Sequence, residues 1–292
     1  MIKVLRVPVS ARPANFLPSA ATISPIDLRE GSPVRAGTYP FSAGDDVITG
    51  WHSHQLHQVE YALAGVVEVE TETAHYLLPP QQAVWIPAGL SHCTTLRRVR
   101  TISVFFDPSM IAAPGGRARI LAAAPVIREM LIYGGRWPIS RPANDPVADA
   151  FFETLANLVL EWLDRETPLC LPTSSDPLLV AVMAYTNAHL DSVVLGDVCR
   201  AVGVSERSLR RAFSSSVGMS WRQYLLTSRL LRAMALLAEP RPSVLEVSTN
   251  VGFESVSAFA RAFGRYTGET PSSYRRRVAV SSSEAGSPRP PQ

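Results

Sequence analysis

The sequence predicts a two-domain α+β protein, in which an N-terminal β domain with attached helices is followed by an all-α domain. A chain of 292 residues is long enough to bury two hydrophobic cores. Short segments typical of β-strands, separated by Gly and Pro, fill residues 46–107. After residue 200, a pattern of helix, glycine turn and helix occurs twice.

The β domain is expected to begin with an arm and early strands in the Pro-rich residues 1–45. Within residues 46–107, Val66–Glu70 alternates between apolar and acidic side chains, which is the period of a strand with one buried face. Ala83–Ile86 and Thr101–Phe106 are further short segments of strand type.

Two helices are expected next, over residues 109–135 and 145–165. The second has a wide apolar stripe, which fits either a dimer seam or a helix packed on its own β domain. The sequence leaves both alternatives open. The stripe consists of Phe151, Phe152, Leu155, Leu158, Val159 and Trp162.

The boundary between the domains is expected at Cys170–Ser175, which has the composition of a linker. Asp176-Pro177 then supplies the N-cap and the first residue of a helix. The Ser- and Pro-rich end from Ser281 is expected to be disordered. The predicted division is a β domain over 1–108, a helical connector and candidate dimerisation segment over 109–170, a linker over 171–177, an all-α domain over 178–278 and a tail over 279–292.

The charge is unevenly distributed. Residues 176–280 carry 13 arginines against eight acidic residues, a net charge of +5. A phosphate-binding domain needs such an excess, although a solvated basic surface explains it equally well. The three scattered cysteines suggest neither a disulfide framework nor a zinc site. Without a long apolar run or a signal-peptide core, a cytoplasmic protein with no membrane contact is expected.

The repeat after residue 200 is the most informative pattern in the chain. Val202-Gly203 recurs 49 residues later as Val251-Gly252. The change to an offset of 50 further on marks a one-residue insertion around Ser255. This outline is typical of two tandem helix-turn-helix units, a motif that places a helix in the major groove of DNA. The later matched pairs are Leu209 with Phe259, Ala212 with Ala262, Phe213 with Phe263 and Gly218 with Gly268.

Helical periodicity selects the residues that face DNA. A helix capped by Ser205 has Leu209 and Phe213 on its apolar face. Opposite that face lie three arginines, which can fork to guanine edges or clamp phosphates: Arg207, Arg210 and Arg211.

The second unit offers less charge to DNA. Ser257 and Arg261 occupy its corresponding face, so we expect weaker base contacts there. Trp221–Glu239 has apolar residues at helical spacing and is expected to form a long helix between the units. Thr270-Pro271 is expected to open a short last helix that Arg275–Arg277 closes.

Residues 176–277 resemble the DNA-binding domain of the AraC/XylS family of bacterial transcription regulators. The resemblance implies seven helices, two helix-turn-helix subdomains and a linker helix. It also implies that the groove-facing residues are Arg207, Arg210, Arg211, Ser257 and Arg261, the positions that periodicity selects. Promoter DNA, a small-molecule effector and RNA polymerase are the implied partners, with a homodimer as an open alternative. The matching stretches are Gly203–Phe213, Gly218-Met219-Ser220, Gly252–Ser255, Phe259, Phe263, Gly268 and Thr270-Pro271.

Five of the six histidines lie within residues 52–92. His52-Ser53-His54 places two imidazoles on one face of an expected strand. Together with Gln58, Gly65 and the segment Pro87-Ala88-Gly89-Leu90-Ser91-His92, this pattern is similar to the two signatures of the cupin fold, a small β barrel. The similarity implies a cupin-like barrel in which Gln58 replaces the metal-binding glutamate of that family.

The histidines suggest two kinds of site. His52, His54 and His92 match the metal-binding histidines of cupins, and three imidazoles can bind a divalent metal. The amide at position 58 weakens such a site, and the alternative is a metal-free effector pocket. The candidate lining of that pocket is Trp51, His52, His54, Gln58, Tyr61, Trp85 and His92.

The sequence therefore predicts a transcription regulator that senses a small molecule or a metal, and not an enzyme. The alternatives left open are a metal-dependent cupin dioxygenase or isomerase with an appended DNA-binding domain, and a constitutive DNA-binding protein whose barrel serves only for dimerisation.

Overall fold

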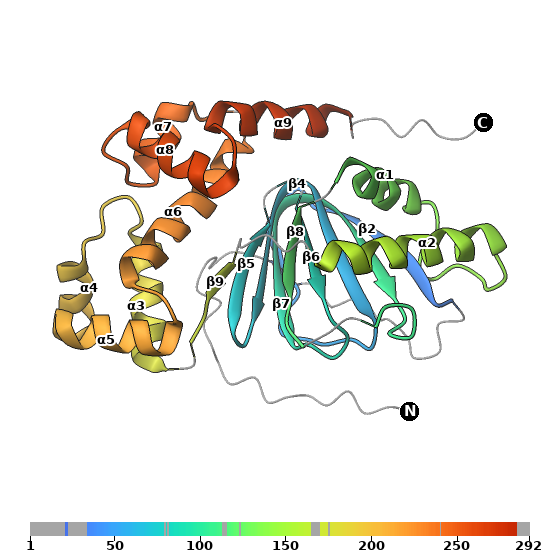
Figure 1. Ribbon diagram of the computed structural model, residues 1–292, viewed down its shortest axis with the longest axis horizontal. Coiled ribbons are helices and arrows are strands. Elements are labelled where there is room, and N and C mark those ends of the chain that lie inside the picture. Colours follow the sequence, from blue (N-terminus) through green and yellow to red (C-terminus); the bar gives the residue numbers. More distant parts are fainter. Residues whose placement is uncertain are drawn as a thin grey trace.

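The computed structural model shows a β-sheet with two helices on one side, followed by a helical domain beside it (Figure 1). None of the described helices is long and apolar enough to cross a membrane. The described residues are 21–22, 34–78, 80, 82–112, 116–122, 124–164, 170–174, 176–239 and 241–284.

Two long strands, β4 and β7, organise the sheet. They pair antiparallel along most of their length, and β4 also pairs with β5 and β6, while β7 also pairs with β2 and β3. The short strands β8 and β9 extend the sheet from β6 and β5. The strands are β1 (Ala21–Thr22), β2 (Ala36–Ser42), β3 (Val47–Ile48), β4 (His57–Thr71), β5 (Ala74–Leu78), β6 (Gln82–Ile86), β7 (His92–Phe106), β8 (Arg119–Ala122) and β9 (Cys170–Pro172).

Strand alternation gives the first half of β4 two different faces. Val59 and Tyr61 point to the side covered by α1 (Pro125–Gly134) and α2 (Pro146–Leu163), where they share a core with both helices. Gln58 and Glu60 point to the opposite side, which we call the polar face, and Ser103 of β7 lies there opposite Glu60.

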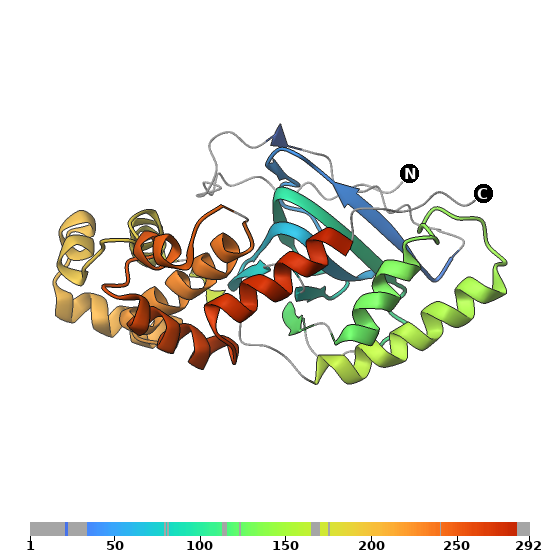
Figure 2. The same ribbon diagram turned by 90° about the horizontal axis from the view of Figure 1, so that it is seen from above.

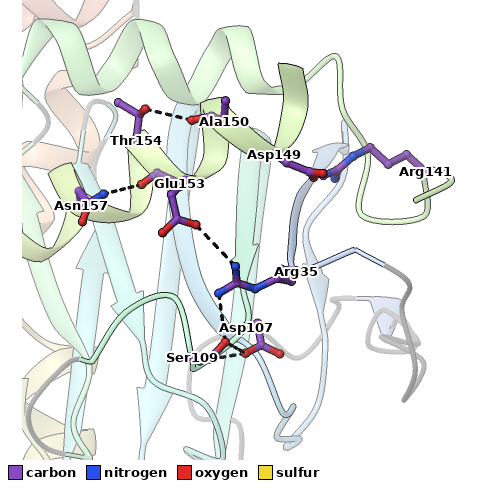
Figure 3. Close-up of polar contacts among 9 residues, drawn as sticks. All are labelled: Arg35, Asp107, Ser109, Arg141, Asp149, Ala150, Glu153, Thr154 and Asn157. Atoms are coloured by element: carbon purple, nitrogen blue, oxygen red, sulfur yellow. Dashed lines mark hydrogen bonds and ion pairs between the residues drawn. The ribbon is translucent and has the colours of Figure 1, made fainter. Parts of the chain in front are cut away.

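Helix α2 packs on the sheet of its own chain. Most of the predicted apolar stripe is buried there, including Phe152, Leu155 and Val159. Arg141 reinforces this packing, because its buried guanidinium donates to the carbonyl of Ala36 in β2 and pairs with Asp149 of α2 at 3.2 Å (Figure 3). Of the two alternatives for the stripe, the structure therefore shows packing within the chain.

A second ion pair joins α2 to the residue that precedes β2. Arg35 lies 3.7 Å from Glu153 of α2 and donates to Ser109 at 3.2 Å (Figure 3). Both charged side chains are more than half exposed, so this ion pair contributes little to stability.

The predicted helix over residues 109–135 is wrong in its first half, because strand β8 occupies residues 119–122. Ile120 and Leu121 are both buried, but in different cores. An apolar run that is buried on both faces has no period that separates a strand from a helix. Pro125 then starts α1, with the preceding Ala124 in extended conformation.

The helical domain contains seven helices in the described residues, as the resemblance implies. Five of these described helices begin at polar caps: Asp176 for α3, Ser205 for α5, Ser220 for α6, Ser243 for α7 and Ser255 for α8. The helices are α3 (Pro177–Ala188), α4 (Leu195–Val202), α5 (Glu206–Val217), α6 (Trp221–Leu237), α7 (Val244–Asn250), α8 (Val256–Thr267) and α9 (Pro271–Glu284).

Two predictions at the domain ends need correction. The expected linker begins with a strand, since Cys170–Pro172 forms β9 on β5. The expected tail begins too early, because α9 continues through Glu284 and Arg275–Arg277 therefore lie within it, not at its end. No Gly or Pro follows Pro271 before residue 286, so nothing local stops the helix.

The two domains touch along one side of the sheet. Helix α9 contacts β4, and α6 contacts β9. Figure 2 shows α9 passing over the strands from the helical domain. The helical domain is therefore packed directly against the β domain.

The two turn glycines provide a matched test of this packing. Gly203 and Gly252 both have positive φ, but a Cβ on Gly203 meets nothing, whereas one on Gly252 lies 2.4 Å from the carbonyl oxygen of Asp191. We expect Gly203→Ala to cost about 1 kcal/mol, from backbone strain alone. Gly252→Ala adds steric overlap and should cost ~3 kcal/mol or more in urea unfolding. Equal losses would contradict the tight packing at Gly252.

Candidate DNA-binding and effector sites

The repeated sequence forms two helix-turn-helix units, α4 with α5 and α7 with α8. Each turn holds a glycine in left-handed conformation, Gly203 with φ 72° and Gly252 with φ 79°. The next helix is capped by Ser205 in the first unit and by Ser255 in the second. The second turn is thus one residue longer, which explains the change of offset in the repeat.

In the first unit, the apolar side of α5 faces inward. Leu209 and Phe213 are fully buried, and the ring of Phe213 meets Tyr224 of α6 at 5.3 Å. The three predicted groove-facing arginines are all exposed. Arg210 forms an ion pair with Glu206 at 2.8 Å while its side chain stays 65% exposed. A pair this exposed is weak, so Arg210 can exchange Glu206 for another partner.

The second unit repeats this arrangement with less charge. Phe259 and Phe263 of α8 are fully buried, while Ser257 and Arg261 are exposed. Sequence reasoning missed Arg265, which is exposed one turn beyond Arg261 and donates to its carbonyl. Its spacing of four residues from Arg261 is the signal that would have included it.

Helix α6 holds the two units in one frame, because it contacts α5 of the first and both helices of the second. The indole of Trp221 donates to Thr186 of α3 at 3.0 Å, and both are buried. Arg229 donates to the carbonyl of Leu190 at 2.8 Å. These contacts confirm the expected long connecting helix and fix its place beside α3.

In the β domain, the three signature histidines come together. The ring centroids of His52 and His92 lie 4.2 Å apart, and those of His54 and His92 lie 5.2 Å apart. The prediction that His52 and His54 share a strand face is wrong, since His52 makes only an isolated bridge to His92 and His54 lies outside any strand. The positive φ of Gly50, 68°, turns the chain just before them.

Each imidazole of this cluster is oriented by a backbone carbonyl. Nδ1 lies 3.0 Å from the Gly50 oxygen in His52, 2.6 Å from Leu56 in His54 and 2.9 Å from Leu90 in His92. Burial lowers the pKa of all three rings, and it lowers that of His92 to about 3. The cluster is therefore neutral near pH 7.

Three further residues extend the cluster along the polar face. His54 Nε2 lies 2.8 Å from Gln58 Oε1, and Gln58 Nε2 lies 2.9 Å from Glu60 Oε2. Ser103 donates to the same carboxyl oxygen. Burial raises the pKa of Glu60. Sequence reasoning missed Glu60 and Ser103, although polar residues at every second position of an apolar strand were a signal.

The aromatic residues predicted to line this site do not join it. Tyr61 and Trp85 lie in the core beneath α1 and α2, on the other face of the sheet. Trp85 packs there against His57, with ring centroids 4.7 Å apart. Trp51 is 38% exposed. Nearness in sequence to the histidines therefore did not predict which face these rings occupy.

The cluster does not fit the divalent metal that the cupin signatures imply. Among the described residues, no group of three or more His, Cys, Asp or Glu side chains is arranged to hold a metal ion. Gln58 brings no negative charge and already faces His54 Nε2. We therefore assign no metal-dependent step to these residues.

Comparisons with known proteins agree with the helical geometry. Residues 198–277 match the family described as a helix-turn-helix domain. The HTH-type transcriptional regulator NimR of Escherichia coli K12 is 28% identical over 255 residues, which cover 86% of this chain and 91% of NimR. The HTH-type transcriptional activator RhaR of the same strain is 39% identical over 134 residues, 44% of this chain and 48% of RhaR. A solved structure of an AraC-type regulator from Chromobacterium violaceum is 29% identical, with a TM-score of 0.35, over 36% of this chain and 95% of that chain.

The family match begins within α4 and ends within α9, so it spans both helix-turn-helix units. Two such units on one frame, in a chain whose matched relatives regulate transcription, define a DNA-binding transcription regulator. The domain that carries both units is of the AraC type.

The buried histidines predict a pH dependence of stability. The pKa of His92 is about 3 in the folded protein, whereas the ordinary pKa of histidine is 6.5. Between these two pH values the unfolded chain binds a proton at this residue and the folded chain does not. The free energy of unfolding should therefore decrease as the pH is lowered from 6.5, with a slope that approaches about 1.4 kcal/mol per pH unit for this residue. Urea unfolding between pH 7 and 4 measures the slope.

Variants separate His92 from the other titrating groups. His92→Phe should flatten the slope, and the exposed His189 offers the control His189→Phe, which should leave it as it is. Glu60 acts in the opposite direction, because its raised pKa makes the folded chain hold a proton longer, so only the difference from the parent is informative. A slope unaffected by His92→Phe would refute the buried neutral ring.

Proposed function

We propose that this chain regulates transcription by binding promoter DNA through α5 and α8, under the control of a small molecule bound by its β domain. The observation that carries the proposal is the pair of equivalent helices, each with a buried aromatic back and an exposed polar front, held by α6. A helix of this kind enters the major groove with its front.

The two helices have unequal roles in this proposal. Arg207, Arg210 and Arg211 of α5 supply base and phosphate contacts, because arginine forks to guanine O6 and N7 and to phosphate oxygens. Ser257 and Arg261 of α8 supply fewer contacts. The first unit therefore contributes most of the sequence preference, and the second mainly fixes register.

The β domain is the proposed sensor. The polar face concentrates histidine, amide and carboxyl groups away from solvent, where each buried polar group costs free energy unless it is paired. A ligand that supplies the missing partners offsets that cost. Gln58 brings no negative charge to the histidines and already faces His54 Nε2, which favours this interpretation over the cupin-enzyme alternative.

The β domain with its two helices comprises the residues up to β9, and the DNA-binding domain follows from Asp176. Action at promoters places the protein in the cytoplasm with RNA polymerase as a partner, and no catalytic role is assigned to it. A second copy would add half-sites without changing the contacts of either unit.

Replacement of one arginine tests the DNA contacts. We expect Arg210→Ala to weaken binding to promoter DNA by ~1–3 kcal/mol and to leave binding to random DNA nearly unchanged, because a base contact carries sequence information. Fluorescence anisotropy at fixed salt, on DNA from the upstream intergenic region and on random DNA of equal length, measures both affinities.

The control removes the same charge elsewhere. Arg35→Ala breaks a similarly exposed ion pair in the β domain and should leave both affinities as they are. Equal losses on the two DNAs for Arg210→Ala would assign Arg210 to phosphate. No preference for the promoter in the parent protein, with or without cell extract metabolites, would contradict the proposed function.

A further inference from the structure

We propose that the polar face of the β domain selects an effector that presents N–H hydrogen-bond donors, such as an amide, amine or amidine, and rejects carboxylates. The inference deepens the proposed sensor function and rests on it. It follows from the directions of the hydrogen bonds in the cluster of His52, His54, His92, Gln58 and Glu60.

The first step is the tautomer of the histidines. A backbone carbonyl only accepts hydrogen bonds, so each Nδ1 that faces one must carry the proton. In a neutral imidazole the other nitrogen, Nε2, is then an acceptor. His92 is 1% exposed, and its Nε2 has no hydrogen-bond partner among the described residues. The cluster thus contains a buried acceptor that needs a donor.

The second step is the direction of the Gln58 amide. If His54 Nε2 is an acceptor, Gln58 must turn its NH₂ group toward it, and its oxygen then faces Glu60, which must be protonated. The opposite amide orientation requires a doubly protonated, cationic His54, because Nδ1 already donates to Leu56 and Nε2 would have to donate to Gln58. Burial favours the first arrangement because it contains no charge.

The third step is the absence of a cation at the carboxyl group. Glu60 is 4% exposed, and its hydrogen-bond partners in the described structure, Gln58 and Ser103, are both neutral. A ligand carboxylate would place its oxygens against imidazole lone pairs and this carboxyl group, and no basic side chain is among the described groups that act on Glu60. An N–H donor instead satisfies His92. A cationic donor in addition favours release of the Glu60 proton to solvent and pairs with the carboxylate that results.

Three probes of nearly equal shape test the selection: benzamidinium, benzamide and benzoate, which differ only in their donors, acceptors and charge. Calorimetric titration of the full chain at millimolar probe concentration measures their affinities for the parent, Glu60→Gln and His92→Phe. Glu161→Gln is the matched control, because it removes a carboxylate from the exposed side of α2.

We expect the affinity to fall from benzamidinium to benzamide to benzoate, by about tenfold or more between the ends, as charge-assisted hydrogen bonds require. Glu60→Gln should weaken benzamidinium by about tenfold and Glu161→Gln should not weaken it. His92→Phe should weaken benzamide and benzamidinium alike, which keeps the test valid if Glu60→Gln fails to fold.

Several results would overturn the inference: benzoate binding as tightly as benzamidinium, benzamidinium affinity unchanged in both variants, or no binding of any probe. Stoichiometric Zn²⁺ binding that His92→Phe abolishes would also overturn it, by assigning the cluster to a metal. Promoter preference, measured by anisotropy on the same preparations, separates the outcomes. If that preference persists while the probe order fails, only the ligand class is wrong and the DNA-binding function stands.

Discussion

The irregularity of strand β4 around Gly65 is the constraint on which the architecture of the β domain depends. The register of β4 against β7 shifts between Ala62 and Val66, and Gly65 adopts φ 76°, which other residues rarely do. Before the shift, even-numbered residues such as Glu60 occupy the polar face. Ala62, on the same side, belongs to the apolar core that is separate from the one beneath α1 and α2. After it, the odd-numbered Val67 and Val69 join that core, while Glu68 turns away to pair with Arg97 at 2.8 Å. Because a shift of one residue exchanges the faces of a strand, one strand can serve the polar cluster at one end and an ion pair at the other.

The helical domain shows how a repeated sequence becomes two unequal units. Both units use a serine cap, a left-handed glycine and a buried aromatic residue on the second helix, so their local physics is the same. Their surroundings differ, because α6 packs its Arg229 against the turn of the second unit, where the guanidinium binds the Leu190 carbonyl beside Gly252. The first turn at Gly203 has open space around it. Equivalent glycines thus serve backbone conformation alone in one unit, and conformation together with close packing in the other.

Local chemistry decides how far such a chain can be predicted from its sequence. Serine caps, the repeat and the groove-facing positions on α5 follow from rules that act over a few residues, and the structure confirms the helices that they predict. The cluster of His52, His54 and His92 also follows, since the two signatures mark it. The side of the sheet on which Tyr61 and Trp85 lie does not follow, because it depends on register with distant strands. Strand β8 was missed for a related reason: its apolar run is buried on both faces and has no helical or strand period of its own.

The contacts between the domains limit how an effector can influence DNA binding. A ligand shifts an equilibrium only by as much as it prefers one arrangement over another, so the arrangement it favours must differ where the recognition helices are held. Both units are held by α6, and α6 meets the β domain at β9, while α9 meets it at β4. Strand β4 also carries Gln58 and Glu60. It is therefore the element common to the proposed effector site and to the helical domain. A displacement of β4 at the polar face can reach α9 within this single strand.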